Sequence, residues 1–225
     1  MPMGRPLLLA LALIASQTAA MTPGADPGVN APFDRPDPQR WGHILEQPGR
    51  ELYDRRHAII AALALKPGMD VADVGAGTGL FTLPFAQAVG PEGRVFAVDI
   101  AAEFVRNIEL RAQAQGLLNV MGIVNDQHST LLPPDAVDLI FLADTYHHFE
   151  QPADMLRSIR DALRPGGELV VIDFQREPGR SSAWVMRHVR AGRDRVIAEI
   201  ELAGFRLDRE EPILRGNFFL RFRKQ

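Results

Sequence analysis

The stretch Asp73-Val74-Gly75-Ala76-Gly77-Thr78-Gly79 decides the fold of this chain. It lies between a short apolar run, Val71 to Val74, that is typical of a buried strand, and a helix-like segment from Leu80 to Val89. Glycines at such a junction allow a tight turn and let the backbone approach a ligand closely. The free N–H groups at the start of the next helix favour a carboxylate or a phosphate. The stretch therefore predicts a ligand-binding turn, and a plain turn is the alternative.

Helix-like and strand-like segments alternate along the rest of the chain from Trp41 onward. The expected helices are 51–65, 80–89, 101–115, 153–163 and 193–202, and the expected strands are 71–74, 94–98, 120–124, 137–143, 168–172, 205–208 and 217–222. This order predicts an α/β fold with a mostly parallel sheet and helices on both faces. Such sheets bind ligands outside the carboxyl ends of their strands, where Asp99, Asp144 and Asp173 stand.

Composition and charge narrow the class of protein. The 225 residues are 46% apolar and 24% charged, which excludes intrinsic disorder as the main state. The formal net charge of -3 provides no strong basic field, so we expect no nucleic-acid partner. The chain has no cysteine, which excludes disulfide scaffolds, cysteine-ligated metals and thiol nucleophiles.

The first forty residues differ from the rest. Residues 1–20 contain one charge, Arg5, then an apolar run and small residues up to Ala20, which is the pattern of a secretory signal peptide. The run is too short for a stable membrane span. Residues 21–40 are rich in proline and glycine and predict a flexible linker before a domain at 41–225. We expect an exported, periplasmic protein if the leader is cleaved; translation from Met21 and a cytoplasmic location is the alternative.

The glycine spacing argues against a dinucleotide oxidoreductase. That class uses the pattern G-x-G-x-x-G, whereas the sixth position counted from Gly75 is Leu80.

The sequence resembles the class I S-adenosylmethionine-dependent methyltransferases over roughly Ala58 to Phe222. The motifs that carry the resemblance are 71–79, 95–99, 125–126, 141–144 and 163–167. It implies a Rossmann-like, doubly wound sheet of seven strands with the last strand antiparallel. It also implies S-adenosylmethionine as cofactor and methyl transfer to a small-molecule acceptor. A quinone-pathway enzyme resembles this core, but no acceptor residue decides the substrate. A cofactor-binding protein without turnover and, less favoured, a dinucleotide oxidoreductase are the alternatives.

The same resemblance assigns roles around the cofactor. Three glycines pass under its methionine part: Gly75, Gly77 and Gly79. Asp73 helps to orient the ammonium group through the loop, and Asp99 accepts hydrogen bonds from both ribose hydroxyls. Asp126 accepts from the adenine amino group, and Asp144 lies near the sulfonium and amino groups.

The acceptor side is less specific. Tyr146 and His147 follow Asp144 and are the candidate catalytic residues, with His147 as a general base. The alternative is that one histidine of the pair His147 and His148 packs under the cofactor and the other faces water. His188 and Arg190 lie where acceptor-binding elements often sit in the family, and a solvated basic loop is the alternative.

Two further expectations concern the helix from Glu51 and a metal. That helix, with Tyr53, is expected to close over the cofactor or simply to pack. Metal-dependent catechol-type methyltransferases carry acids at the positions of Asp144 and Asp173, but Phe174 stands where that subgroup has an amide. The sequence therefore predicts no metal site.

Overall fold

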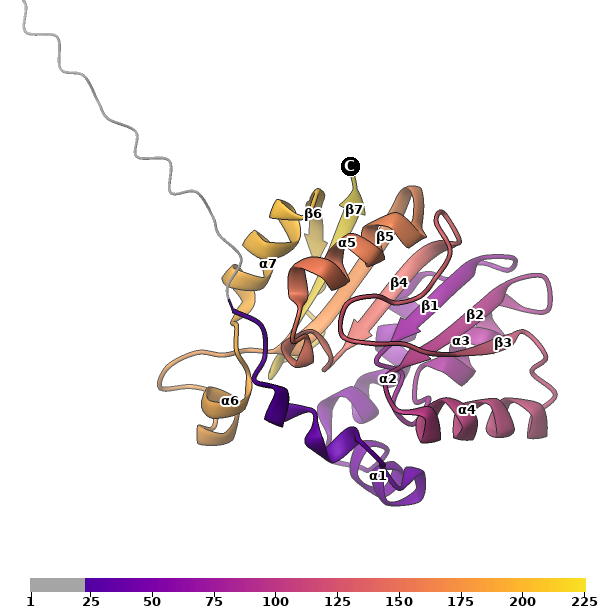
Figure 1. Cartoon of the computed structure of the whole chain (residues 1–225), viewed down its shortest axis with the longest axis horizontal. Coiled ribbons are helices and arrows are strands. Elements are labelled where there is room, and N and C mark those ends of the chain that lie inside the picture. Colours follow the sequence, from indigo (N-terminus) through magenta and orange to yellow (C-terminus); the bar gives the residue numbers. More distant parts are fainter. Residues whose placement is uncertain (1–22) are drawn as a thin grey trace, which may run out of the picture.

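Seven strands form one sheet in the order β3-β2-β1-β4-β5-β7-β6 (Figure 1). The structure is a computed structural model that describes residues 23–225, so the expected signal peptide lies outside the described residues. The strands are β1 (Asp70–Val74), β2 (Arg94–Asp99), β3 (Val120–Val124), β4 (Val137–Ala143), β5 (Leu163–Phe174), β6 (Phe205–Glu210) and β7 (Asn217–Lys224).

Strand pairing confirms the predicted doubly wound topology. The pairs β1–β2, β2–β3, β1–β4 and β4–β5 are parallel, whereas β7 runs antiparallel to both β5 and β6. The last strand of the chain is thus the antiparallel one, as expected. The strand order reverses between β1 and β4, which is the place where open α/β sheets bind ligands.

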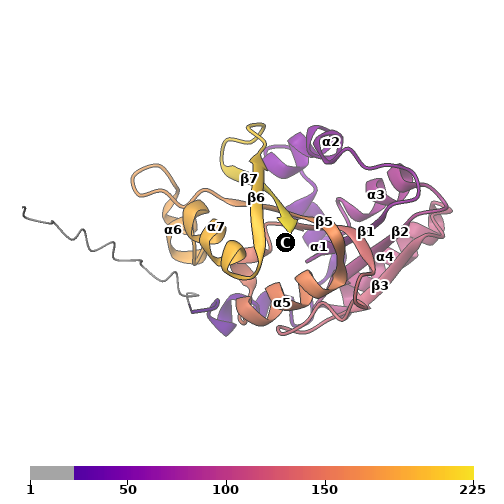
Figure 2. The ribbon, with the colours of Figure 1, turned by 90° about the horizontal axis from the view of Figure 1, so that it is seen from above.

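Helices cover both faces of the sheet because successive strand residues point to opposite sides. In β1, Val71 packs in a cluster with α2 (Glu51–Leu63) and α3 (Thr82–Val89), while Ala72 packs in a cluster with α5 (Pro152–Ala162) and α7 (Arg193–Leu202). Figure 2 shows α2 and α3 on one side of the sheet and α5 on the other. A further helix, α4 (Ala102–Ala114), lies on the same face as α2 and α3, where Ile108 packs in a cluster with Ala97 of β2 and Leu83 of α3.

One predicted strand begins earlier than expected. We expected a turn at residues 165–167 and a strand from Glu168, but β5 begins at Leu163, which pairs with Val137. Gly166 has a φ of +74°, and residues 164–167 form an irregularity after Leu163, so that continuous pairing of β5 with its neighbours begins at Glu168, the expected start of the strand. The other elements agree with their expected ranges to within two residues.

The N-terminal segment differs from the expected flexible linker. We call residues 23–50 the N-terminal cover; they contain η1 (Pro27–Val29), η2 (Ala31–Phe33) and α1 (Pro38–Leu45). Prolines occupy the first turn of each of these helices, where a fixed φ favours the helix and no N–H is lost. The Asn30 side-chain amide donates to the His148 carbonyl (3.0 Å) and to Glu150 Oε1 (2.8 Å). This segment is therefore packed on the domain, and in Figure 1 it runs from beside α6 (Ala183–His188) to α1.

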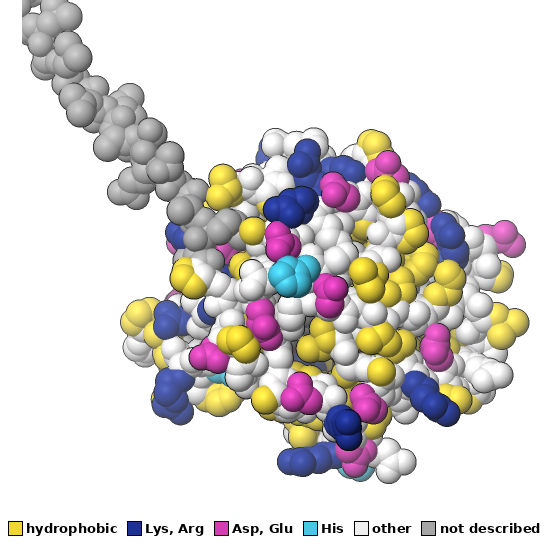
Figure 3. Space-filling view, viewed as in Figure 1, with side chains coloured by type: hydrophobic (Ala, Val, Ile, Leu, Met, Phe, Trp, Pro, Cys, Tyr) yellow, Lys and Arg dark blue, Asp and Glu magenta, His cyan; other side chains and the backbone are white. Residues whose placement is uncertain are grey.

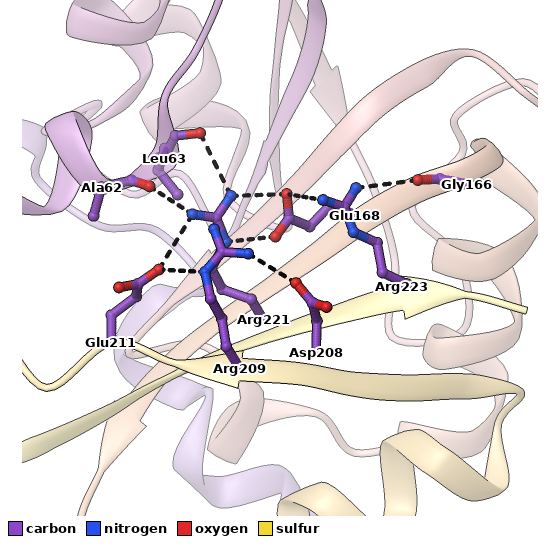
Figure 4. A network of polar contacts seen from close by, with 9 residues as sticks. All are labelled: Ala62, Leu63, Gly166, Glu168, Asp208, Arg209, Glu211, Arg221 and Arg223. Carbon is purple, nitrogen blue, oxygen red and sulfur yellow. Dashed lines mark hydrogen bonds and ion pairs between the residues drawn. The ribbon is translucent and has the colours of Figure 1, made fainter.

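A buried ion-pair network joins α2, β5 and β7 toward the amino end of β5 (Figure 4). Arg221, 2% exposed, forms a bidentate ion pair with the Glu168 carboxylate. Its guanidinium also donates to the carbonyls of Ala62 and Leu63 at the end of α2. The network holds the last turn of α2 to the sheet.

Charged side chains of both signs mix on the face shown in Figure 3, among hydrophobic ones. Within residues 23–225, no helix is long and apolar enough to cross a membrane.

Candidate active site

A cavity of about 490 Å³ lies at the carboxyl ends of β1, β2 and β4. The glycine turn after β1 and the acids that end β2 and β4 line one side of it. The N-terminal cover and a group of histidines line the other side. A cavity of this size, mostly apolar with a few polar groups, is typical of a small-molecule site.

The glycine turn packs so closely on its neighbours that two of its positions have no space for a side chain. Gly75 has a φ of +74°, and a Cβ there would lie 2.3 Å from the Thr145 side chain. Gly77 has a φ of +53°, and its N–H donates to Asp99 Oδ2 at 2.8 Å. Gly75 and Gly77 line the cavity, whereas Gly79 packs on Ile108 behind it. The first two glycines thus form the floor of the site and the third lets the turn pack on α4.

Asp99 stands at the end of β2 with its carboxylate held in place by backbone. Its two oxygens accept hydrogen bonds from the N–H groups of Gly77 (2.8 Å) and Ala101 (2.9 Å). Burial raises the pKa of Asp99 to about 6, despite these stabilising hydrogen bonds. Each carboxylate oxygen has a second lone pair, so the group can accept two further donors from a ligand.

Asp73 lies behind the turn rather than in the cavity. It is 2% exposed and accepts a hydrogen bond from Thr82 Oγ1 at 2.6 Å, at the start of α3. Burial raises its pKa to about 7. Asp73 therefore acts on a ligand only through the turn that it supports.

Asp144 ends β4 in a left-handed conformation, with a φ of +51°. Its carboxylate pairs with Arg50 (2.7 Å) of the N-terminal cover and accepts from Asn217 Nδ2 (2.6 Å) of β7. Burial raises the pKa of Asp144 to about 6, against the attraction of Arg50. The residue lines the cavity and ties the cover to the sheet.

Asp126 lies in the loop after β3 and also lines the cavity. Its Oδ1 accepts from the N–H groups of His128 (2.7 Å) and Ser129 (2.8 Å), which folds the loop around the carboxylate.

His147 and Asp173 form a buried pair in the wall opposite the glycine turn. His147 Nδ1 donates to Asp173 Oδ1 (2.7 Å), and the His147 backbone N–H donates to Oδ2 (3.0 Å). Burial would lower the pKa of His147, but the charge and hydrogen bond of Asp173 outweigh it and the pKa is raised. The same pairing lowers the pKa of Asp173 although burial opposes it. The Nε2 atom of His147 is free of this hydrogen bond.

His148 and His188 lie beside His147 in the same wall. Burial lowers the pKa of His148 to about 3, with a further contribution from the neighbouring histidines. Burial also lowers the pKa of His188, whose ring stacks on Trp184 with centroids 4.4 Å apart. Both histidines are thus neutral at pH 7.

Tyr146, a candidate catalytic residue, does not reach the cavity. It is fully buried, and its hydroxyl donates to Glu199 Oε2 at 2.7 Å in the core between η3 (Tyr146–His148) and α7. Arg190 pairs with the same Glu199 carboxylate at 2.9 Å. Its guanidinium therefore lies in this buried contact and does not line the cavity, where an acceptor-binding residue was expected. The side chain of Tyr53 packs under Arg56, away from the cavity.

Sequence reasoning missed the part of the site that the N-terminal cover supplies. Phe33 stacks near Trp41 (4.9 Å between ring centroids) and meets His148 edge-on (5.3 Å). Arg50 reaches Asp144, as described above. The aromatic residues and the arginine were visible in the sequence, but the prolines between them were interpreted as a linker.

The strand-end and turn residues fit S-adenosylmethionine. A Cβ at Gly77 would meet nothing closer than 3.7 Å, so the backbone of the turn is open to a ligand from the cavity at this residue. The Asp99 carboxylate has acceptor capacity for vicinal hydroxyls, and Asp144 carries a negative charge for a cationic ligand. In this arrangement Gly75, Gly77, Asp99, Asp126 and Asp144 would hold the cofactor.

Comparisons with known proteins agree with this fit. Residues 65–203 match the family described as "Methyltransferase domain". A curated relative, the ubiquinone/menaquinone biosynthesis C-methyltransferase UbiE of Shewanella frigidimarina, is 32% identical over 121 residues, which is 53% of this chain and 48% of the relative. The chain thus spans about half the length of the curated relatives it matches.

Solved structures show the same fold. An S-adenosylmethionine-dependent methyltransferase from Aquifex aeolicus is 28% identical, with a TM-score of 0.73 over 84% of this chain and 99% of that one. A possible exported protein from Bordetella parapertussis, 19% identical with a TM-score of 0.63 over 85% of this chain and 80% of that one, shares the fold alone. With the matched residues, the topology and the site in agreement, this chain belongs to the methyltransferase domain family, in the class I S-adenosylmethionine-dependent group.

Proposed function

We propose that this protein transfers a methyl group from S-adenosylmethionine to a small, largely apolar aromatic acceptor that carries a removable proton. The observation that carries the proposal is the cavity itself. One wall presents the glycine turn and Asp99 for the cofactor, and the other presents the buried His147–Asp173 pair among aromatic rings. Its curated relatives are named as C-methyltransferases of quinone biosynthesis, which supports an aromatic acceptor.

The aromatic rings that line the cavity suit a flat, apolar molecule. They come from the N-terminal cover, α4, β5 and α6: Phe33, Trp41, Phe104, Phe174 and Trp184. Aromatic side chains bury a large area and favour stacked or edge-on contacts with another ring. An acceptor held among them is shielded from water and oriented toward the cofactor side of the cavity.

The residues of the chain supply position, charge and a proton acceptor. When bound, the cofactor supplies an activated methyl group. The Asp144 carboxylate lies on the cofactor side and favours a positive ligand there. His147 Nε2 can accept the acceptor's proton while Asp173 keeps the imidazole in the required tautomer and stabilises its charged form. Arg50 and the rest of the cover close the cavity over both ligands.

Calorimetric titration with S-adenosylmethionine tests the cofactor half of the proposal. Wild-type protein is expected to bind one cofactor per chain, and Asp99→Ala to lose most of that affinity because the ribose hydroxyls lose their acceptor. Asp194→Ala removes an acid with a 93% exposed side chain and serves as the matched control. No binding by the wild type, or equal binding by Asp99→Ala, contradicts the proposal.

A transfer assay with methyl-labelled cofactor tests the reaction. Hydroxylated aromatic and quinol compounds are expected to accept label, and a polar amine panel is not. Cofactor binding without label transfer to either panel would favour a binding protein without turnover. Tight binding of NADH in a fluorescence titration would revive the oxidoreductase alternative.

For location, we infer export from the leader-like pattern of residues 1–20. Cleavage after Ala20 and translation from Met21 both give a chain that begins at residue 21, so its mass does not distinguish them. Fractionation of bacterial cells that express the full chain does. Protein in the periplasmic fraction supports export, and protein confined to the cytoplasmic fraction overturns it.

A further inference from the structure

Three histidines meet in the wall of the cavity away from the glycine turn. His147 and His148 come from η3, directly after β4, and His188 comes from the last turn of α6. One ring nitrogen of each lies within 4.8 Å of those of the other two. The ring centroids are 4.2 Å (His147–His148), 5.1 Å (His147–His188) and 5.3 Å (His148–His188) apart.

The hydrogen bonds of two of these rings leave their Nε2 lone pairs available. The Asn30 amide nitrogen donates to the His148 carbonyl and to Glu150, so its Oδ1 is the atom that faces His148 Nδ1 at 3.0 Å. His148 therefore donates through Nδ1. His147 also donates through Nδ1, to the Asp173 carboxylate. In each neutral ring the proton is on Nδ1, and Nε2 is an acceptor.

This arrangement is the one found around metal-binding histidines. Such histidines donate their other ring N–H to a carboxylate or a carbonyl oxygen, which fixes the ring and its tautomer. Asp173 and Asn30 hold His147 and His148 in that way. Trp184 stacks on His188, with 23° between the ring planes, and holds the third ring.

We propose that His147, His148 and His188 bind a divalent first-row transition ion, Zn²⁺ in the first place, with Asp173 and Asn30 as supporting residues. Imidazole nitrogens suit this class of ion, and three histidines with one open position are a known catalytic zinc arrangement. Tetrahedral zinc at about 2.0–2.1 Å from each nitrogen separates its ligand atoms by about 3.3 Å. The ligand atoms, which lie within 4.8 Å of one another, therefore need to approach by up to about 1.5 Å on binding. His188 and the Trp184 ring that stacks on it belong to the same six-residue helix, so they can shift together.

The open position faces the cavity, which all three histidines line. With an ion bound, the Nε2 lone pair of His147 would be a metal ligand, so His147 would not be the proton acceptor in that state. The ion would instead orient an oxygen of the acceptor and lower the pKa of its hydroxyl group. That use of the ion rests on the proposed function, whereas the binding site itself does not. The sequence predicted no metal because only the strand-end acids Asp144 and Asp173 were considered, and nothing in it placed His188 beside the His147-His148 pair.

Metal titration of the full chain, without a histidine tag and after removal of metals by a chelator, tests the site. Zn²⁺ is followed by competition with a chromogenic chelator, and Co²⁺ by the visible absorption of a tetrahedral complex. We expect one ion per chain and micromolar or tighter affinity. His148→Ala and His188→Ala are each expected to weaken binding by more than about 100-fold, and Asp173→Asn by about 10- to 100-fold.

The controls separate a lost ligand from a lost fold. His57 is exposed on α2, so His57→Ala should bind metal as the wild type does. His147→Ala is avoided because it leaves the buried Asp173 without its partner, and circular dichroism confirms folding of the other variants. Wild-type binding no tighter than that of the His148→Ala/His188→Ala double variant, or binding only at millimolar metal, overturns the proposal. The titration contains no cofactor, so its outcome is independent of whether S-adenosylmethionine binds.

Discussion

At the scale of single residues, Asp99 links cofactor affinity to pH. Its pKa is raised to about 6 by burial, so the carboxylate is ionised at pH 7 and protonated at pH 5 in the free protein. A protonated carboxyl accepts hydroxyl hydrogen bonds poorly, so affinity for S-adenosylmethionine should fall by up to about tenfold per pH unit below 6. Calorimetry between pH 5 and 8 measures this slope.

Asp144, with a pKa also near 6, contributes to the same slope. We therefore expect Asp99→Asn to bind more weakly at pH 7 and to show a shallower pH dependence, not a flat one. A slope as steep as that of the wild type would show that Asp99 is not the titrating group.

Asp73 should make the fold less stable as the pH rises, whereas an ion-paired acid makes the fold more stable. Its folded pKa of about 7 lies above its usual value of 3.8, so the folded state holds a proton that the unfolded state releases. The resulting stabilisation is complete below the unfolded pKa and is lost as the pH rises through about 7. Asp73→Asn keeps an acceptor for Thr82 and has no charge to bury. We expect the free energy of unfolding of the wild type to fall relative to this variant by roughly 2–4 kcal/mol between pH 4 and pH 8.

Urea denaturation of the cofactor-free proteins at the two pH values measures this difference. Parallel pH profiles for Asp73→Asn and the wild type would mean that Asp73 is ionised in the fold throughout.

At the scale of elements, the N-terminal cover should open on its own, as a short segment fastened by contacts between side chains. Phe33 packs on Trp41 and His148, Asn30 bonds to His148 and Glu150, and Arg50 pairs with Asp144. We expect Phe33→Ala to accelerate tryptic cleavage at the exposed Arg40, and bound cofactor to slow it, because cleavage follows local opening. Mass spectrometry of the fragments gives the rate. Leu118, 88% exposed after α4, provides the control Leu118→Ala, which should leave the rate unchanged. An unchanged rate in Phe33→Ala would show that the ring does not fasten the cover.

The elements that sequence could predict are those with strong local signals. Alternating apolar runs gave the seven strands, and the glycine turn gave the position of the site. Three carboxylates line the cavity, those of Asp99, Asp126 and Asp144. Each ends or follows a parallel strand, and this position in the sequence was enough to predict their place. These positions follow from topology, which the order of segments determines.

Other features depend on contacts between residues far apart in the chain. Tyr146 is next to a candidate base in sequence, but its partner is Glu199, fifty-three positions later, and this places its hydroxyl in the core. The cover was misread because Pro27, Pro32 and Pro38 suit both a linker and the first turn of a short helix. Only the partners of Asn30 and Phe33 distinguish the two, and those partners are not local.

At the scale of the whole molecule, the Arg221 network fastens α2 to the sheet away from the cavity. Arg221→Met leaves the Glu168 carboxylate, 6% exposed, without its main partner. Removing one member of a buried pair costs about 3–5 kcal/mol, whereas replacing both by apolar residues is close to neutral. We expect a loss of that size in Arg221→Met and recovery of most of it in the Arg221→Met/Glu168→Leu double variant.

Chemical denaturation measures these free energies, and Arg180→Ala, which removes an 82% exposed partner of Glu177, is expected to change stability by less than about 0.5 kcal/mol. A double variant no more stable than Arg221→Met would mean that the network stabilises the fold through more than the pair itself.

The cover also sets the order in which the site can form. Asn30 bonds to residues 118 and 120 positions later, and Arg50 pairs with a residue 94 positions later. During synthesis, the cover therefore emerges long before the loop on which it rests. Loop closure over such long sequence separations is slow relative to local folding, so the cover docks only after the sheet has assembled. Because the cavity is built from the cover and from residues after β4, it exists only when nearly the whole chain has left the ribosome. The protein thus cannot bind cofactor tightly until late in its own synthesis.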